Sequence, residues 1–262
     1  MRRGRIHVVV FESEFGSPEE FLSKVRSELP GYREKNVIFL FPENVLGKKP
    51  IERKQAKELA VRMSNILRAH GNANVVYSVL ERAGRSGKVL ITNSGYLVSP
   101  KLAGGGIAYQ VYPKVTTYFK GEYLTDGDKA AMVKHSADFK KALELFSKLA
   151  GRVKEFPRIK IDGKTVELRV CADAAQGPIT DLYPARTSGK KAHLVLVPAN
   201  NLPLNEFEFM HFSETLASRG RIVVADKERG SAIARRRGNR ILFKKLDQKK
   251  TVRASRFRIT RG

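Results

Sequence analysis

Short apolar runs rich in valine and isoleucine recur along the chain, and amphipathic helical patterns separate them. The runs have the length of β-strands and lie at Ile6–Phe11, Asn36–Phe41, Asn74–Val79, Lys88–Thr92, Val166–Cys171, His193–Val197, Arg221–Ala225 and Asn239–Phe243. Chains in which strands alternate with amphipathic helices fold into layers of helix and sheet. The sequence therefore predicts an α/β fold.

Four segments carry the helical pattern. Ser17-Pro18-Glu19-Glu20 is a capping box with proline at the first helical position, which predicts a helix over Phe21–Leu29. Glu52–Ala69 has apolar residues at a spacing of about 3.6 residues and ends before Gly71. Lys129–Leu149 and Asn205–Ser218 are the other two predicted helices. Helix Lys129–Leu149 is interpreted either as outer-layer packing or as an insertion that covers a pocket or builds an interface.

The rest of the chain predicts strands and one loop. Gly104–Gly106 is a local flexible loop inside a predicted hairpin from Leu97 to Val111. Basic and apolar residues alternate from Arg235 to Arg258, a strand pattern with one solvent-exposed face. No repeat or Pro/Gly-rich linker divides the sequence. We expect a single domain over residues 1–262, with a basic C-terminal extension from about residue 244.

Composition narrows the class of protein. Hydrophobic content of 42% and charged content of 29% are ordinary for a soluble globular protein. No apolar run approaches the roughly 20 residues that span a bilayer, so no membrane partner is expected. The N-terminal stretch MRRGRIHVVVFESEF is interpreted as a first strand rather than a signal peptide. A single cysteine cannot form an internal disulfide, which favours a cytoplasmic location.

The net charge of +24 is unusual, with 50 basic residues against 26 acidic ones. Such a field attracts nucleic acid, anionic membranes or acidic substrates, but it speaks to non-specific binding and not to chemistry.

Three side chains offer a candidate for chemistry. Cys171 follows the apolar run TVELRV, Glu43 ends the run VIFLFPE, and Lys114 lies in YPKVTTY. A thiol, a carboxylate and an ammonium can act as nucleophile, base and oxyanion donor. Taken singly, each has a plainer interpretation: a lone cysteine that ends a strand is more often an inert core residue. Glu43 at the end of an apolar run needs a partner if it is buried, and Lys114 is the candidate.

The order of these segments resembles the nitrilase or carbon–nitrogen hydrolase superfamily. FPE at 41–43 resembles the family's glutamate segment, and ITNSGYLVSP followed by AYQVYPK resembles its passage into the lysine motif. VELRVCAD at 166–173, HLVLVPAN at 193–200 and RIVVADKERGSAIARRRGNRIL resemble the cysteine elbow and the strands after it. The chain departs from the family pattern at Pro113, at Ala225-Asp226 where Ala-Asn is usual, and after Cys171, where the arginine-proline segment is missing.

This resemblance implies a four-layer αββα sandwich that assembles as a homodimer or larger homo-oligomer and uses no cofactor. It implies that Glu43 takes the proton of Cys171 and that the thiolate attacks an amide or nitrile carbon. Lys114 and the backbone N–H of Ala172 would stabilise the oxyanion, and Glu122 would orient the lysine or the substrate. The product of the first half-reaction would be a thioester. We expect an amide rather than a nitrile, while transfer of the acyl group to an amine stays open.

Other active sites find less support in the sequence. None of His7, His70, His135, His193 and His211 lies in a motif that places it near Cys171, and His193 is interpreted as structural. No metal-ligand pattern, GxGxxG motif or P-loop is present, so no metal is expected. The competing hypothesis is a catalytically weak or inactive protein of the same fold that binds a polyanion such as nucleic acid. Its footprint would be the basic residues Arg235-Arg236-Arg237, Lys244-Lys245, Lys249-Lys250, Arg253, Arg256 and Arg258.

Overall fold

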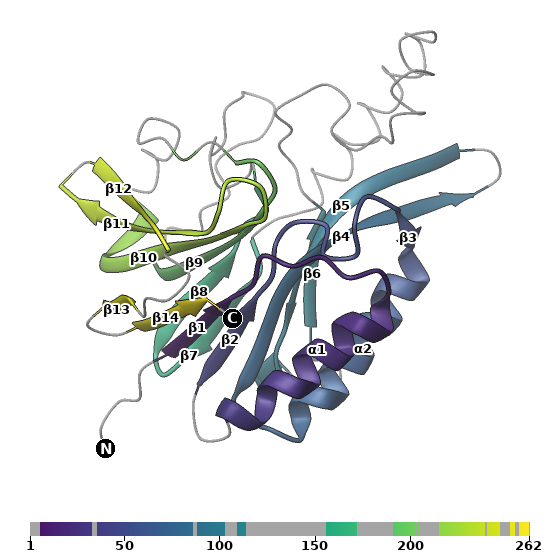
Figure 1. Ribbon diagram of the computed structural model, residues 1–262, viewed down its shortest axis with the longest axis horizontal. Helices are drawn as coiled ribbons and strands as arrows, with labels where there is room; N and C mark the ends of the chain where they lie inside the picture. The colour runs from purple at the N-terminus through teal and green to yellow at the C-terminus, as the bar shows by residue number, and fades with distance from the viewer. Residues whose placement is uncertain are drawn as a thin grey trace, which may run out of the picture.

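In the residues that it describes, the computed structural model consists of two β-sheets packed face to face, with two helices on the outside of the larger sheet (Figure 1). It describes residues 6–32, 36–85, 88–102, 109–113, 156–171, 191–202, 204, 215–238, 240–246, 252–254 and 257–261.

The larger sheet has eight strands. They are β1 (Ile6–Val10), β2 (Val37–Leu40), β3 (Ile51–Glu52), β4 (Ala73–Arg85), β5 (Lys88–Val98), β6 (Tyr109–Pro113), β13 (Val252–Ala254) and β14 (Phe257–Arg261). Their order is β13-β14-β1-β2-β4-β5-β6, and β3 pairs with β4. β14, β1, β2 and β4 run parallel, whereas β4, β5 and β6 are antiparallel. The C-terminal segment therefore lies beside the first strand and extends this sheet.

The smaller sheet has six strands in the order β12-β11-β10-β9-β8-β7. They are β7 (Arg158–Ile161), β8 (Lys164–Leu168), β9 (Ala192–Ala199), β10 (Leu216–Asp226), β11 (Ala232–Arg237) and β12 (Arg240–Lys245). The central strands β8, β9 and β10 are parallel, and the outer pairs are antiparallel. The parallel strands bring their carboxyl ends to one edge of the sheet.

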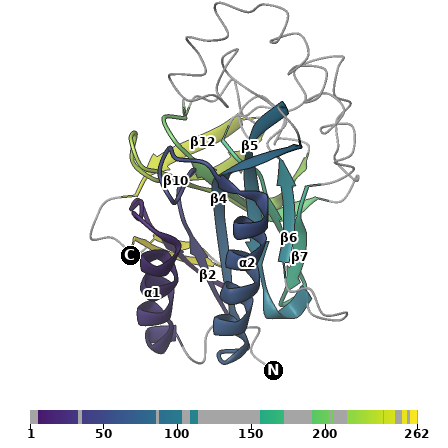
Figure 2. The same ribbon diagram turned by 90° about the vertical axis from the view of Figure 1, so that its right-hand side faces the viewer.

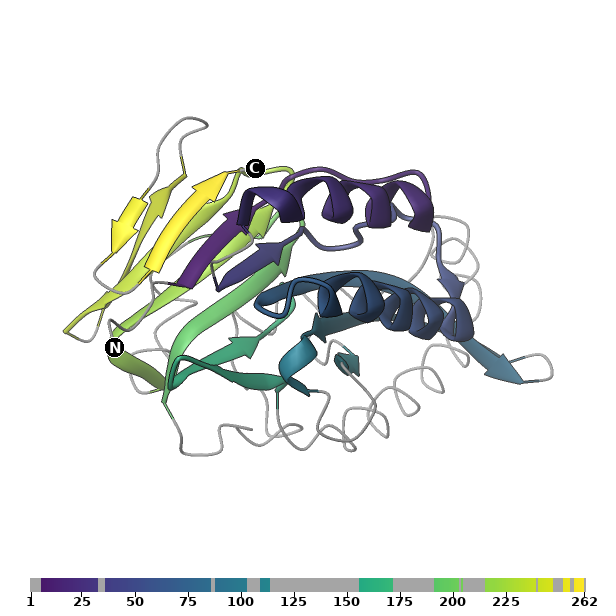
Figure 3. The same ribbon diagram turned by 90° about the horizontal axis from the view of Figure 1, so that it is seen from below.

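Two helices cover the outer face of the larger sheet (Figures 2 and 3). They are α1 (Pro18–Glu28) and α2 (Arg53–Arg68), and short 3-10 turns occupy Leu29–Tyr32 (η1) and Pro100–Leu102 (η2). The predicted cap of α1 is present, since Ser17 Oγ accepts from the Glu20 N–H at 3.2 Å. The Glu20 carboxylate in turn accepts from the Gly16 N–H at 2.8 Å. The buried stripe of each helix packs on aromatic residues of the sheet such as Phe41 and Tyr77.

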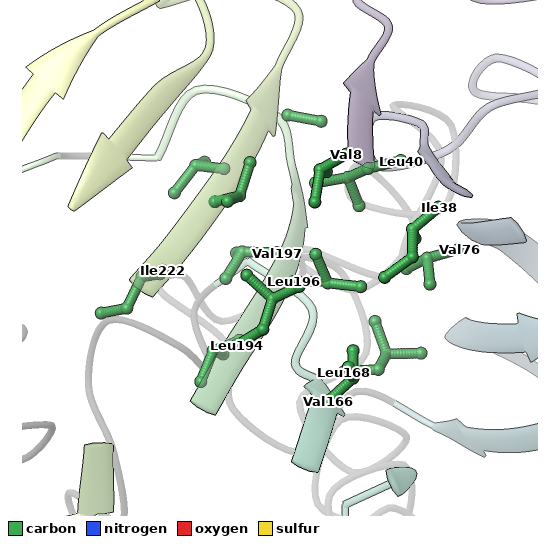
Figure 4. Close-up of a cluster of buried hydrophobic side chains, with 14 of the residues drawn as sticks. Val8, Ile38, Leu40, Val76, Val166, Leu168, Leu194, Leu196, Val197 and Ile222 are labelled. Carbon is green, nitrogen blue, oxygen red and sulfur yellow. The ribbon is translucent and has the colours of Figure 1, made fainter. Parts of the chain in front are cut away.

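The opposite face of the larger sheet packs against the smaller one. Figure 4 shows aliphatic side chains from both sheets in this layer, with Val8, Ile38, Leu40 and Val76 on one side and Val166, Leu168, Leu194 and Leu196 on the other. All of these side chains are fully buried. Burial of each contributes about 1.5–3 kcal/mol. This dry layer fixes the two sheets against each other, and with them the loops at the strand ends.

The α/β sandwich predicted from the sequence is confirmed. The predicted helix Lys129–Leu149 lies outside the described residues, as do positions 205–214 of the fourth predicted helix. The end of that fourth helix was predicted wrongly, because residues 216–218 belong to β10. β10 has an irregular register against β9 between Leu216 and Arg221, which separates this first part of the strand from its apolar centre. No helix in the described part of the chain is long and apolar enough to cross a membrane.

Candidate active site

Glu43 lies just beyond the carboxyl end of β2 and is 3% exposed. The chain reaches it by continuing the sheet pairing, since the Phe41 N–H donates to the carbonyl of Val76 at 2.9 Å. The Glu43 N–H then crosses to the smaller sheet and donates to the carbonyl of Ala199 at 3.2 Å. The next residue, Asn44, has a positive φ of 57°, so the backbone turns sharply immediately after the glutamate. The carboxylate is thus held at the boundary between the two sheets.

Cys171 occupies the corresponding position on the smaller sheet, three residues after β8 ends, and is 3% exposed. Its φ is +44°, in the left-handed region that residues other than glycine adopt rarely and at a cost. Its N–H donates to the carbonyl of Pro198 at 2.8 Å. Its Sγ lies 3.9 Å from the carbonyl oxygen of Asn200, within range for a thiol donor. A strained nucleophile turn after a strand is a known way to present a reactive side chain.

The end of β9 holds both residues. Three consecutive positions, Pro198, Ala199 and Asn200, supply the carbonyl groups that bind Cys171 N–H, Glu43 N–H and the thiol respectively. Glu43 and Cys171 are far apart in the sequence and come from different sheets. Backbone hydrogen bonds to one strand end therefore bring them to a common place, independently of their side chains.

Asn93 is a further site residue that the sequence analysis did not single out. It lies in β5, is 3% exposed, and its Nδ2 donates to Glu43 Oε1. An ionised carboxylate only accepts hydrogen bonds, so the amide nitrogen must face Glu43 and the amide oxygen must point elsewhere. That Oδ1 is buried and has no hydrogen-bond partner among the described residues. A buried acceptor without a partner costs about 1–3 kcal/mol.

Asn200 shows the same feature next to Cys171. Its main-chain oxygen contacts the thiol, while its side-chain Oδ1 is buried and has no partner in the described part of the chain. The site thus contains two carboxamide oxygens, one on the Glu43 side and one on the Cys171 side, whose acceptor capacity is unused within the described residues.

A buried charge network precedes the cysteine on β8. Glu167 is fully buried and accepts from Arg158 Nε and Arg169 Nε, both at 2.6 Å. Arg158 stands directly opposite Glu167 on β7, and the guanidinium of Arg169 lies 4.6 Å from the centre of the Phe156 ring. Two arginines share this one carboxylate, which lies four residues before the cysteine in the sequence.

Asp226, which departs from the expected Ala-Asn pattern, is fully buried at the end of β10. Its Oδ1 accepts from the N–H groups of Asn201, Glu228 and Arg229, and its Oδ2 accepts from Leu202 N–H at 2.7 Å. A carboxylate suits this position because all four contacts are donors. Asp226 thereby connects the β10–β11 turn to the segment that follows β9 and Asn200.

The remaining predicted site residues have different outcomes. Lys114, Glu122 and Ala172 lie outside the described residues, so their roles stay predictions. His193 lies in β9, and its Nδ1 accepts from the Thr165 N–H at 3.1 Å, a backbone contact within the smaller sheet. In the described part of the chain, no group of three or more His, Cys, Asp and Glu residues is arranged to hold a metal ion.

The fold is similar to that of an amidase from the nitrilase superfamily, as comparison with solved structures shows. A variant of an amidase of the nitrilase superfamily from Nesterenkonia has a TM-score of 0.56 and 16% identity, covering 94% of this chain and 87% of that chain.

Two further structures of the Nesterenkonia amidase are also similar. Its complex with butyramide has a TM-score of 0.52 and 16% identity, over 93% of this chain and 91% of that one. A structure in which acrylamide has added to the active-site cysteine has a TM-score of 0.52 and 16% identity, over 93% of each chain. No protein-family model and no curated protein sequence matches this chain.

Proposed function

We propose that this protein is a cysteine-dependent hydrolase of a non-peptide carbon–nitrogen bond, with Cys171 as nucleophile and Glu43 as base. The observation that carries the proposal is the placement of both residues on the end of β9, with the cysteine in a left-handed backbone conformation. Such strain is retained where the surrounding structure imposes it, which is common at active sites. The similar structures are those of an amidase with an active-site cysteine, which supports the same class of reaction.

In the proposed reaction, Glu43 accepts the proton of the Cys171 thiol, and the thiolate attacks the carbonyl carbon of an amide. The negative charge that develops on the carbonyl oxygen would be stabilised by the Lys114 ammonium and the Ala172 N–H. Collapse of the tetrahedral intermediate breaks the carbon–nitrogen bond, and Glu43 returns its proton to the leaving nitrogen. Ammonia leaves and a thioester remains. Glu43 then removes a proton from water, whose oxygen attacks the thioester. The carboxylic acid leaves, and the proton on Glu43 returns to the sulfur of Cys171, which regenerates the thiol.

An amide is the substrate we propose, ahead of a nitrile. The Nesterenkonia amidase has been obtained in complex with acrylamide and with butyramide, both short primary amides. A homo-oligomer and a cytoplasmic location remain proposals from the sequence.

The pH dependence of Cys171 alkylation by iodoacetamide tests the proposal, because the chain has a single cysteine and intact mass reports its modification without ambiguity. An unperturbed thiol, with a pKa of about 8.5, reacts slowly at neutral pH because little of it is thiolate. We expect fast labelling near pH 7 in the wild type and at least tenfold slower labelling in Glu43→Gln.

Glu81→Gln is the matched control for that experiment. Glu81 is 2% exposed, close to the 3% of Glu43, but it belongs to the helix-covered side of the larger sheet, where Tyr96 donates to it. We expect Glu81→Gln to label at the wild-type rate. Equal, slow labelling in the wild type and in Glu43→Gln would refute an activated thiol. Release of ammonia from butyramide by the wild type, abolished in Cys171→Ala, would establish the reaction.

A second candidate function, polyanion binding, is favoured by the charge on β10, β11 and β12. These strands carry eight basic residues and no acidic residue other than the buried Asp226, namely Arg219, Arg221, Arg235, Arg236, Arg237, Arg240, Lys244 and Lys245. Arg221 and Arg235 stand directly opposite each other. Burial and the nearby charge of Arg235 lower the pKa of Arg221.

Retention on duplex DNA as a function of salt tests this second candidate. A binder that neutralises several phosphates loses affinity linearly with the logarithm of salt concentration, with a slope of about −0.9 per phosphate. We expect Arg235→Gln, Arg236→Gln and Arg237→Gln combined to reduce the slope, and Cys171→Ala to leave it unchanged. Absence of retention at physiological salt would exclude the binding function while leaving the hydrolase proposal intact.

A further inference from the structure

We propose that Asn93 links the base to the substrate: its Nδ2 fixes the Glu43 carboxylate, and its Oδ1 accepts a hydrogen bond from the N–H of a primary carboxamide. The inference rests on the proposed hydrolase function and extends it, because it names a residue that selects amides over substrates without an N–H donor. It concerns the two ends of one buried side chain.

The nitrogen end is set by the chemistry of its partner. Nδ2 donates to Glu43 Oε1, and a carboxylate that is to accept the thiol proton must be ionised and hence an acceptor. This bond restricts the rotation of the carboxylate. Asn93 lies centrally in β5, paired with Leu80 of β4 on one side and one residue from Ser94, which pairs with Pro113 of β6. The Asn93 side chain that donates to Glu43 therefore lies on an inner strand of the sheet and not on a loop.

The amide oxygen of Asn93 is available to accept a hydrogen bond from a ligand. The Oδ1 atom is buried and has no partner in the described part of the chain, although buried carboxamide oxygens are normally satisfied. The other buried asparagine of this sheet, Asn74, follows that rule: its Nδ2 donates to the carbonyl of Val37 at 2.9 Å and its Oδ1 accepts from Ser99 Oγ at 2.6 Å. Asn93 thus differs from a structural asparagine at one atom, and that atom belongs to a side chain bonded to the base.

A primary amide is the ligand that supplies what is missing. Its nitrogen carries two N–H donors and is the atom that must leave. If Asn93 Oδ1 binds one of these N–H groups, the nitrogen is held beside Glu43, which must return a proton to it when the carbon–nitrogen bond breaks. No net proton is transferred to or from Asn93. An ester or a nitrile has no N–H group and leaves Oδ1 without a partner, and sites built to bind such a donor reject analogues that lack it.

The test compares butyramide with methyl butyrate, which give the same butyryl thioester and differ in the leaving group. Asn93→Leu removes both ends of the side chain. We expect kcat/KM for the ester to fall about tenfold through loss of Glu43 positioning, and kcat/KM for the amide to fall at least a further tenfold.

Asn93→Asp separates the two ends and guards against misfolding of the leucine variant. It has the same shape and keeps an oxygen acceptor, but at neutral pH it lacks the donor to Glu43. We expect losses of similar size for amide and ester, so that the amide-to-ester ratio stays within about threefold of the wild type. Asn74→Leu is the control for a buried asparagine lost elsewhere in the same sheet, and it should lower stability without moving the amide-to-ester ratio.

The outcomes are distinguishable from failure of the proposed function. If Asn93→Leu and the wild type have the same amide-to-ester ratio, the inference is wrong even though the hydrolase proposal stands. If the wild type hydrolyses neither substrate, the hydrolase proposal is wrong, and protection of Cys171 against alkylation provides the second test. Protection by butyramide, but not by methyl butyrate, that disappears in Asn93→Leu would support amide recognition. Equal protection in both proteins would overturn it.

Discussion

Replacement of Glu167 by glutamine tests whether the ion pairs of Glu167 with Arg158 and Arg169 stabilise the fold because they are buried. Glu167 is fully buried, and the side chains of Arg169 and Arg158 are 2% and 13% exposed. Removing one partner of a buried ion pair typically costs 3–5 kcal/mol, roughly, since the remaining charges are poorly solvated. Glutamine has nearly the same volume, so the change tests the charge and not the packing.

The expected size of the effect follows from that range. For a chain of about this length, 1 kcal/mol corresponds to roughly 2–4 °C in Tm, so Glu167→Gln should lower Tm by roughly 6–20 °C. Thermal unfolding followed by circular dichroism measures this. Because Glu167 and Arg169 lie on the strand that leads to Cys171, we also expect slower alkylation of Cys171 in the folded variant.

An exposed ion pair of similar geometry provides the control. Arg62 binds Glu19 through two hydrogen bonds of 2.6 Å, but these side chains are 49% and 69% exposed. Surface pairs contribute little because water and salt screen them. Glu19→Gln should therefore leave Tm close to the wild-type value. If Glu167→Gln and Glu19→Gln shift Tm by the same small amount, the reasoning from burial is refuted.

Three further predictions concern stability. The buried hydroxyl of Tyr77 has no partner among the described residues, so Tyr77→Phe should raise the free energy of unfolding by about 1 kcal/mol; a loss in urea denaturation would contradict this. Asp226→Asn places an NH₂ group against backbone donors and should cost about 2–3 kcal/mol by the same assay, whereas an unchanged midpoint would show that the four contacts are not needed. Burial, aided by the charge of Glu81 and its hydrogen bond, raises the pKa of Tyr96 above its usual value. The unfolded chain then releases this proton first, so the free energy of unfolding should fall by up to about 1.4 kcal/mol per pH unit above pH ~10. Tyr96→Phe should reduce that slope, and an identical slope would count against the assignment.

The local patterns of the sequence predict the fold where burial is uniform along an element. The apolar runs at β1, β2 and β9 are buried almost throughout, and their predicted limits agree with the structure within one or two residues. Helix α1 was predicted from its cap, which is present. In these segments apolar residues are buried and polar residues are at least partly exposed, so the local sequence pattern is enough to predict the element.

Prediction was poorer where buried polar residues interrupt a strand. The sequence indicated Asn74–Val79 and Lys88–Thr92, but β4 and β5 run over Ala73–Arg85 and Lys88–Val98 and extend past their neighbours (Figure 1). Thr92, Asn93 and Ser94 are polar and precede a glycine, a composition typical of turns. Their burial is possible because partners from elsewhere in the chain are close, as Glu43 is to Asn93. No window of neighbouring residues contains that information.

The residues of the candidate site also differ in how far the local sequence predicts them. Glu43 and Cys171 were found from motif order, because each follows an apolar strand. Asn93 lies in the segment ITNSGYLVSP, which in the sequence indicates only the approach to the lysine motif. The alternation of side chains along a strand would have identified it. Every second residue of β5 faces the same way, so Asn93 shares a face with Ile91, Gly95 and Leu97, and Leu97 belongs to the core between the sheets. An asparagine on an otherwise apolar inward face needs a polar partner.

Backbone contacts fix the positions of Glu43 and Cys171, and these contacts do not depend on neighbouring side chains. Pro198, Ala199 and Asn200 hold the two residues through main-chain carbonyl groups, so substitutions of neighbouring side chains leave the anchoring bonds in place. Asn93 acts differently, because its contact with Glu43 is made by the side chain. Substrate preference can therefore change through side chains such as Asn93 while the meeting point of nucleophile and base is preserved. A substitution at Asn93 should therefore change the ratio of kcat/KM for the amide to kcat/KM for the ester. The rate of Cys171 alkylation measures whether the placement of nucleophile and base is retained.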